Sequence, residues 1–378
     1  MSQPTEFVMV LGLQRYSQDF FRRAEAEVRK EIPDFRLHIF EDRDVTARPA
    51  EVEAAIARCQ CLILSLITLN ETAEVLIPMV ERHDPPVVFS FEGLPEVMRL
   101  NKVGSYNLKA GKGMPKPVQN VARLLVGGRE EDALYGYVKL QKITAKLINF
   151  LPGKRLNDFR NWTNVNNYWT HRSIANAANM FKLILREYSG MTHLRVDPVV
   201  ELPNMGFAHP DAPKLFASPA EYERWEKERN RARKGMPAPL GTVAVLSFRA
   251  HILSGADYPH KIVHALEAVG LRVLPIFVMG IESHIVVREW LSHMQVDLII
   301  NTMGFPLVGG PAGSTKAGLT TDVARELLGK LDVPYIVAQP LFVQDEDDWR
   351  ERGVGPLQST FLYSLPEMDG AIAPVVLG

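Results

Sequence analysis

The feature that most constrains the fold of this chain is a repeated alternation of short apolar runs with amphipathic segments. The alternation begins near Phe7, loosens after Glu92 and starts again at Thr242. Continuous apolar runs are typical of parallel strands buried on both faces, and apolar residues at helical spacing are typical of the helices that cover them. The sequence therefore predicts an α/β fold with two open, mostly parallel three-layer units, Rossmann-like or flavodoxin-like, joined by a helical segment.

The predicted elements divide the chain into three parts. Strands are predicted at 7–13, 36–40, 61–67 and 87–91 in the first unit, and at 242–248, 272–278, 296–301 and 334–338 in the second. The segments 132–150, 168–188 and 221–234 have helical periodicity. We predict an α/β domain at 1–150, a helical connector at 151–235 and the start of a second α/β region at 236–378. Because 372–377 begins another apolar strand, we expect the second region to be truncated.

Composition and charge narrow the classes of protein. Apolar residues make up 46% of the 378 residues, charged residues make up 23%, and the net charge is −1. These values are typical of globular proteins and give no electrostatic reason to expect nucleic acid as a partner. No apolar run approaches the roughly 20 residues of a transmembrane helix, and the polar start lacks the features of a signal peptide. We expect a soluble, cytoplasmic protein whose Cys59 and Cys61 are buried, reduced thiols.

Two residues after the first strand of the second unit are candidates for ligand binding. In open parallel sheets, ligands bind beyond the carboxyl ends of the strands, where Arg249 and His251 are predicted to lie. The guanidinium of Arg249 suits a carboxylate, and His251 suits a hydrogen-bond donor, an acid or a metal ligand. The alternative for both is local pairing or capping of a helix.

A glycine-rich run at 309–316 is the second candidate. Gly309 and Gly310 allow the backbone to approach a ligand closely, although a plain flexible loop has the same composition. The run lacks the spacing of a phosphate-binding Walker loop, and the chain has no G-x-G-x-x-G fingerprint after a predicted strand. Nucleotide binding by this chain is therefore not predicted.

Three further patterns have a structural and a functional interpretation. His260 and His264 are four residues apart, but they lack the glutamate of a zinc-protease motif. The aromatic and asparagine residues of 159–169 fit either a stacking surface or helix packing, and we favour packing. Glu367 and Asp369 precede Gly370 and are typical of a turn.

Several runs together resemble one family, the large subunit of magnesium chelatase in its bacteriochlorophyll form. In order, the runs are Leu94–Lys102 with Gly104 and Ser105, Arg249–Ile252 with Gly255, Leu307–Ala312, Lys330–Ala338 and Leu365–Gly370. The resemblance implies a subunit that binds protoporphyrin IX and, with ATP-hydrolysing motor subunits, inserts Mg²⁺. The runs that contain Arg249, His251, Gly309 and Gly310 are motifs of the family, and these four residues are our candidates for substrate binding. The resemblance transfers no catalytic or metal-binding residue to this chain.

Two alternatives stay open at this point. The first is the related large subunit of cobalt chelatase, against which the N-terminal region 1–150 counts because that region resembles the magnesium family. The second is a tetrapyrrole-binding or docking module without catalytic activity.

Overall fold

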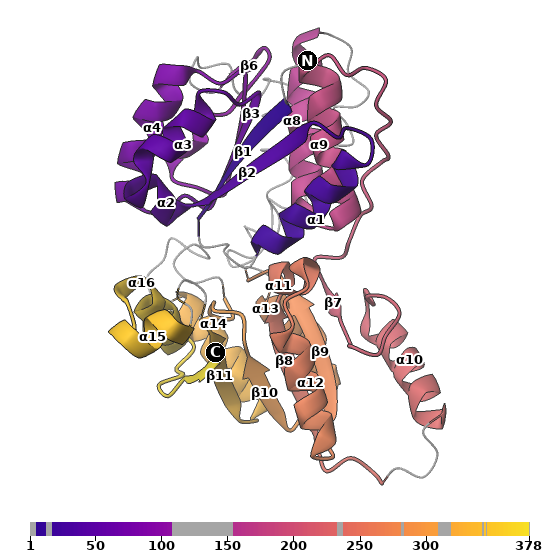
Figure 1. Cartoon of the computed structure of the whole chain (residues 1–378). Coiled ribbons are helices and arrows are strands. Elements are labelled where there is room, and N and C mark those ends of the chain that lie inside the picture. Colours follow the sequence, from indigo (N-terminus) through magenta and orange to yellow (C-terminus); the bar gives the residue numbers. More distant parts are fainter. Residues whose placement is uncertain are drawn as a thin grey trace. The chain divides into compact units, whose positions relative to one another are not determined.

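Two six-stranded sheets organise the chain, which is described by a computed structural model (Figure 1). The structure describes residues 5–12, 17–107, 154–232, 237–280, 283–308, 319–341, 344 and 346–377. These residues form two compact units, one reaching to Leu202 and the other starting at Pro203. Each unit has one sheet with helices on both of its faces, so the predicted α/β class is confirmed.

The first sheet has four parallel strands and an antiparallel hairpin at one edge. Its order is β2-β1-β3-β4-β5-β6. The parallel strands are β1 (Thr5–Leu11), β2 (Phe35–Glu41), β3 (Cys61–Ser65) and β4 (Val87–Phe91), and the hairpin is β5 (Lys102–Val103) with β6 (Tyr106–Asn107). Since successive side chains of a strand point to opposite faces, Phe7 and Met9 belong to one core, and Val8 and Val10 belong to the other.

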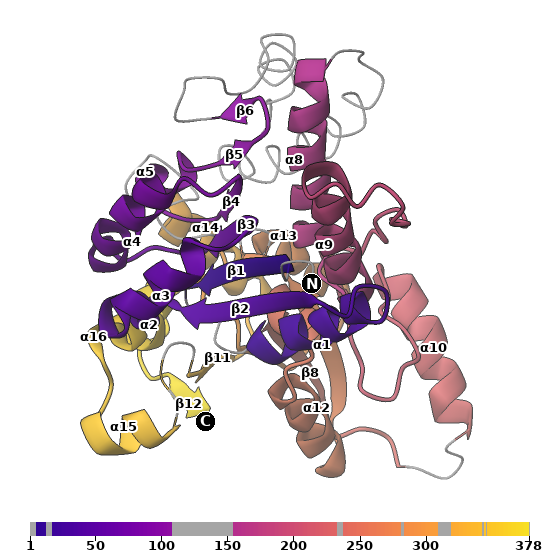
Figure 2. The same cartoon turned by 45° about the horizontal axis from the view of Figure 1, so that its top comes forward.

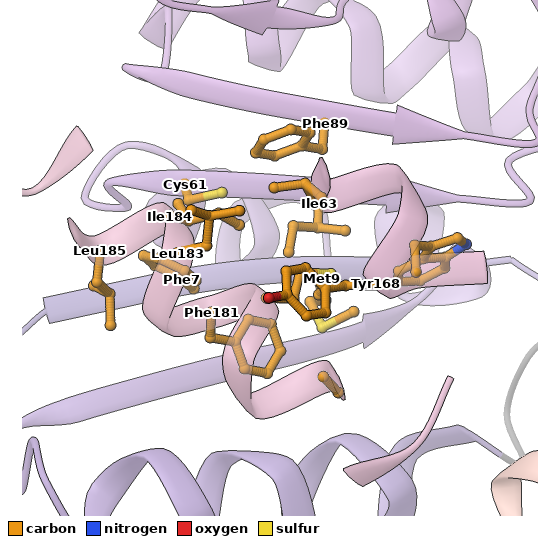
Figure 3. Close-up of a cluster of buried hydrophobic side chains, with 14 of the residues drawn as sticks. Phe7, Met9, Cys61, Ile63, Phe89, Tyr168, Phe181, Leu183, Ile184 and Leu185 are labelled. Atoms are coloured by element: carbon orange, nitrogen blue, oxygen red, sulfur yellow. The ribbon is translucent and has the colours of Figure 1, made fainter. Parts of the chain in front are cut away.

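Helices cover both faces of this sheet (Figure 2). One face packs against α2 (Asp42–Ala47), α3 (Pro49–Ile56), α4 (Asn70–His83) and α5 (Pro95–Met98). The opposite face packs against α1 (Gln18–Arg29), α8 (Lys154–Thr170) and α9 (Ile174–Tyr188). Figure 3 shows this second core, in which Phe181 and Ile184 of α9 lie over Phe7, Met9 and Ile63.

The predicted helical connector at 151–235 is therefore divided between the two units. Helices α8 and α9 complete the first core because their apolar side chains cover a sheet face that would otherwise be exposed. Helix α10 (Pro219–Ala232) packs in the second core through Tyr222 and Trp225. The single helix predicted at 168–188 is wrong at its start, because α8 ends at Thr170 and α9 begins at Ile174. Ser173 caps α9, since its hydroxyl accepts from the Asn176 amide at 3.1 Å.

The second sheet has the order β12-β11-β10-β8-β9-β7. Only β7 is antiparallel to its neighbour among these described strands. The strands are β7 (Met205–Phe207), β8 (Thr242–Phe248), β9 (Arg272–Val278), β10 (Leu298–Asn301), β11 (Tyr335–Pro340) and β12 (Val375–Leu377).

The helices of the second unit also lie on both sheet faces. Helices α10, α13 (Ser283–Glu289) and α14 (Leu319–Leu331) contribute to the larger core, whereas α12 (Tyr258–Ala268) covers the other face. The remaining helical segments are α11 (Arg249–Ser254), a 3₁₀ turn (Leu291–His293), α15 (Glu346–Arg352), α16 (Pro356–Ser359), a π-helical turn (Thr360–Ser364) and α17 (Leu365–Glu367).

The two sheets share one plan at their centres. In each unit the second parallel strand lies on one side of the first, and the third lies on the other side, giving β2-β1-β3-β4 and β9-β8-β10-β11. This order is that of flavodoxin-like folds, and it creates a switch point at the carboxyl ends of the first and third strands. The switch point of the second sheet lies between β8 and β10.

Candidate functional site

The carboxyl edge of the second sheet is the candidate site. Strands β8 and β10 run parallel and end side by side, with Leu246 opposite Asn301 in the register. Just beyond this pair, the Thr302 hydroxyl donates to the Leu246 carbonyl at 3.0 Å and lies 3.4 Å from the Ser247 hydroxyl. These bonds fix the ends of the two strands at the place where open α/β sheets bind ligands.

Arg249 lies at this edge, as the sequence predicts. It is the first residue of α11, directly after β8, and only 5% of its surface is exposed. Its Nε donates to the Pro203 carbonyl at 2.8 Å. Burying a guanidinium without hydrogen-bond partners would cost free energy, so this bond gives Arg249 a structural role as well. Its contact with a ligand stays a prediction.

His251 lies two residues after Arg249 on α11 and is a neutral imidazole. It is 3% exposed, and its Nδ1 is 2.7 Å from the Tyr258 hydroxyl. The edge of its ring packs on Phe248, with 5.4 Å between the ring centroids. Burial lowers the pKa of His251 to about 3, so the ring is uncharged at neutral pH. His251 can therefore offer a hydrogen bond or a lone pair to a ligand, but not a positive charge.

Gly309 and Gly310 lie outside the described residues, so the structure does not test their predicted contacts. The described chain before them is firmly packed, with Leu307 fully buried and Val308 2% exposed in the larger core of the unit. The base of the predicted loop is therefore part of the fold.

A partly buried polar network also lies at this edge, and none of its residues was among the predicted site residues. Both carboxylate oxygens of Asp369 accept from the Leu307 amide, at 3.0 and 2.9 Å, and Oδ2 also accepts from the Tyr335 hydroxyl at 2.8 Å. The Asn301 amide group donates to the same hydroxyl at 2.7 Å. Burial raises the pKa of Asp369 to about 6, although the hydrogen bonds from Leu307 and Tyr335 lower it. The predicted turn is present, since the Asp369 amide donates to the Pro366 carbonyl.

One group of side chains in the second unit has the composition of a metal site. His209, Asp211 and Glu267 have potential ligand atoms within 4.8 Å of one another. However, the Arg229 guanidinium already bonds both carboxylates, at 2.6 Å to Asp211 and at 2.6 and 2.7 Å to Glu267. Although burial opposes its ionisation, Glu267 has a pKa below the ordinary value because Arg229 and His209 donate to it. The cation of this cluster is Arg229, so we interpret the cluster as a structural clamp between α10, α12 and the loop that follows β7.

The first of the family-like runs, Leu94–Lys102, has a structural role. Asn101 is fully buried, and its side chain brackets the Ser90 backbone by accepting from the amide at 3.0 Å and donating to the carbonyl at 2.9 Å. Its Oδ1 also accepts from the Trp162 indole at 2.9 Å. The run therefore joins β4 to α8. The aromatic residues of 159–169 pack in the same core, with Trp169 stacked on Phe91 at 4.7 Å, as expected for packing.

Comparison with known proteins now places the chain in a family. The family described as CobN/Magnesium Chelatase matches residues 166–378. The chain belongs to this family. A second family, described as Domain of unknown function (DUF3479), matches residues 6–163. The border between the two matches lies within α8, whereas the compact units divide after Leu202.

Individual family members match along the chain. The magnesium-chelatase H subunit of Chlorobaculum parvum is 42% identical over 384 residues, which cover 100% of this chain and 29% of that protein. The chloroplastic magnesium-chelatase protein ChlH of Oryza sativa subsp. indica is 32% identical over 85% of this chain and 24% of its own length. The chain thus spans about a quarter to a third of the length of these curated relatives.

The cobalt branch of the family is a more distant relative. The aerobic cobaltochelatase protein CobN of Pseudomonas aeruginosa is 23% identical over 215 residues, or 54% of this chain. The magnesium relative covers the whole chain at nearly twice that identity. This difference favours the magnesium branch, as the first 150 residues predict. Within the part of the chain that the structure describes, no helix combines the length and apolarity needed to cross a bilayer.

Proposed function

We propose that this chain belongs to the porphyrin-binding subunit of a magnesium chelatase, which inserts Mg²⁺ into protoporphyrin IX in the synthesis of chlorophyll or bacteriochlorophyll. The observation that carries the proposal is the 42% identity to a magnesium-chelatase H subunit along the entire chain. The proposal includes a cytoplasmic location, which cell fractionation would test.

The chemistry of the reaction suits a subunit that binds the tetrapyrrole and leaves ATP to a partner. Mg²⁺ gives up its water ligands reluctantly, so insertion needs a source of free energy and an enclosed site. The sequence contains no Walker loop. We therefore propose that motor subunits bind and hydrolyse the ATP, while this subunit binds the porphyrin.

We propose that the carboxyl edge of the second sheet forms part of the porphyrin-binding site. Protoporphyrin IX has an apolar macrocycle and two propionate groups, for which a planar guanidinium such as that of Arg249 is a suitable partner. The neutral His251, two residues further along α11, offers a hydrogen bond. Contacts of Gly309 and Gly310 with the macrocycle remain part of the proposal.

A reconstitution assay tests the proposed function and separates it from the alternatives. The natural full-length protein is mixed with its motor subunits, ATP, Mg²⁺ and deuteroporphyrin, and the fluorescence of the magnesium porphyrin is followed. We expect product only when all components are present. A parallel reaction supplies Co²⁺ and a metal-free corrin in place of Mg²⁺ and deuteroporphyrin, and insertion of Co²⁺ there alone would support the cobalt alternative. Porphyrin binding without any metal insertion would support a docking module.

A further inference from the structure

The chain that leaves the carboxyl end of β10, residues 301–308, is held by the polar network around Asp369. We propose that Asp369 is a positioning residue, which fixes this segment at the edge of the second sheet so that the edge can bind the tetrapyrrole. This inference rests on the proposed function, because that function supplies the ligand.

The network contacts the segment at three alternate residues. Asn301 accepts from the Met303 amide at 2.9 Å and donates to the Phe305 carbonyl at 3.1 Å. Asp369 accepts from the Leu307 amide with both oxygens. Tyr335 connects the two side chains, since its hydroxyl accepts from Asn301 and donates to Asp369. Every second backbone position from 303 to 307 is therefore bonded to one connected set of side chains.

The direction of the bonds fits a carboxylate at Asp369. The Leu307 amide and the Tyr335 hydroxyl both donate to Asp369, and the Asn301 amide donates into the same chain. A protonated Asp369 would bring a hydrogen to a place where Leu307 and Tyr335 already present hydrogens. The segment therefore depends on the charge of one residue that lies 62 positions further along the chain.

The burial of the network supports a role in positioning. Asn301 is 1% exposed and Leu307 is fully buried, whereas Tyr335 and Asp369 are half-buried, so the network reaches from the core toward the surface. Burial also raises the pKa of Asp369 to about 6, which places the loss of its charge just below neutral pH. Three of the family-like runs meet here, because Leu307, Tyr335 and Asp369 each come from a different run.

Two variants and one control test the proposal in the natural full-length protein. Asp369→Asn keeps the size of the side chain but removes the charge and one acceptor. Tyr335→Phe removes one donor to the carboxylate and leaves the Leu307 bond in place. Glu367→Gln is the matched control, since Glu367 is an exposed acid two residues away on the same turn.

The first measurement is independent of the ligand. Hydrogen exchange of the peptide covering 302–308 is followed by mass spectrometry well above the pKa of Asp369. We expect Asp369→Asn to accelerate exchange of this peptide by at least about tenfold, and Glu367→Gln to leave it unchanged. Unchanged exchange in Asp369→Asn would overturn the positioning role, whether or not the protein binds porphyrin.

The second measurement links the network to binding. Deuteroporphyrin affinity is measured by fluorescence quenching between about pH 5 and 8. We expect the wild type to lose affinity as the pH falls through about 6. Relative to it, Asp369→Asn should bind at least about tenfold more weakly at high pH and lack this pH step. Tyr335→Phe should move the step to higher pH, because the Tyr335 bond lowers the pKa of Asp369.

The outcomes separate this inference from the proposed function. Equal affinity and equal pH profiles of the wild type and Asp369→Asn would overturn it. If Asp369→Asn does not fold, a wild-type step near pH 6 that Tyr335→Phe fails to move would overturn it. If the wild type binds no porphyrin at all, the proposed function and the ligand-binding part fail, while the exchange measurement still decides whether Asp369 positions the segment.

Discussion

His251 connects the burial of a single residue to the stability of the second unit. Its pKa is about 3 in the folded chain and 6.5 when unperturbed, so protons bind preferentially to the unfolded state between these values. The stabilising effect is complete above pH 6.5 and is lost as the pH falls. We expect His251→Gln to remove a slope of about 1.4 kcal/mol per pH unit below pH 6, measured by urea unfolding of the second unit. Equal slopes in variant and wild type would show that His251 is not buried as a neutral ring.

Asp369 has the opposite effect on stability. Its pKa is raised from 3.8 to about 6, so the folded state holds the proton more tightly than the unfolded state does. Asp369 should therefore contribute a fall of about 3 kcal/mol to the free energy of unfolding as the pH rises from 4 to 6, against the opposite slope that His251 contributes. Asp369→Asn should remove this fall, and Glu367→Gln should retain it. A fall of the same size in Asp369→Asn would assign it to another group.

The sequence predicts some of these residues and misses others for a physical reason. Arg249 and His251 follow a strand directly, so their place at the sheet edge can be read from local periodicity. Asp369 shows only turn composition in the sequence, because its partners Leu307 and Tyr335 are 62 and 34 residues away. The register of β10 and β11 brings Asn301 near Tyr335, and the turn after α17 brings Asp369 to them. Neither arrangement can be read from local sequence.

At the scale of helices and strands, the Arg229 clamp joins α10 to α12 and to the loop after β7. Its side chain is 11% exposed, and those of Glu267 and Asp211 are 21% and 35% exposed. The clamp is therefore less exposed than a surface ion pair and less buried than a core pair. A surface pair stabilises a protein by up to about 1 kcal/mol, and breaking a fully buried pair costs about 3 to 5 kcal/mol. We expect Arg229→Ala to lower the unfolding free energy by about 2 kcal/mol in chemical denaturation.

Arg231→Ala on the same helix is the control for this clamp, since Arg231 is exposed. It should change the free energy of unfolding by less than about 0.5 kcal/mol. Equal effects of the two variants would show that the clamp does not stabilise the unit. Stabilisation by added Zn²⁺ in the wild type would instead favour a metal site at His209, Asp211 and Glu267.

Helices α8 and α9 illustrate how far element patterns predict a fold. The periodicity of α9 is plain in the sequence, whereas α8 is not predicted as a helix of its own. The sequence pattern also does not tell which sheet receives the apolar faces of these helices. The deciding contacts are long-range, such as Trp162 with Asn101 and Phe181 with Phe7, whose ring centroids are 6.1 Å apart. The break between the helices had a local signal in Ser173, a favoured capping residue.

At the scale of the whole molecule, the two-unit division predicts how the chain can be shortened. A polypeptide of residues 1–150 lacks α8 and α9, so that α1 is the one described helix left on that face of the first sheet. A polypeptide of residues 1–202 retains both helices. We expect 1–202 to unfold cooperatively on heating and 1–150 to show no cooperative transition and to bind hydrophobic dyes. Cooperative unfolding of 1–150 would mean that the first sheet is stable without this cover.

The most direct test of the proposed function is the affinity of the natural full-length protein for deuteroporphyrin, measured by fluorescence quenching. We predict saturable binding by the wild type. Arg249→Ala should bind at least about tenfold more weakly, because a charge-assisted bond worth about 1.5 to 3 kcal/mol is lost. Arg325→Ala, which removes an exposed guanidinium on α14, should bind like the wild type. Absence of saturable binding by the wild type would contradict the proposed function, and equal affinity of Arg249→Ala would exclude Arg249 from the site.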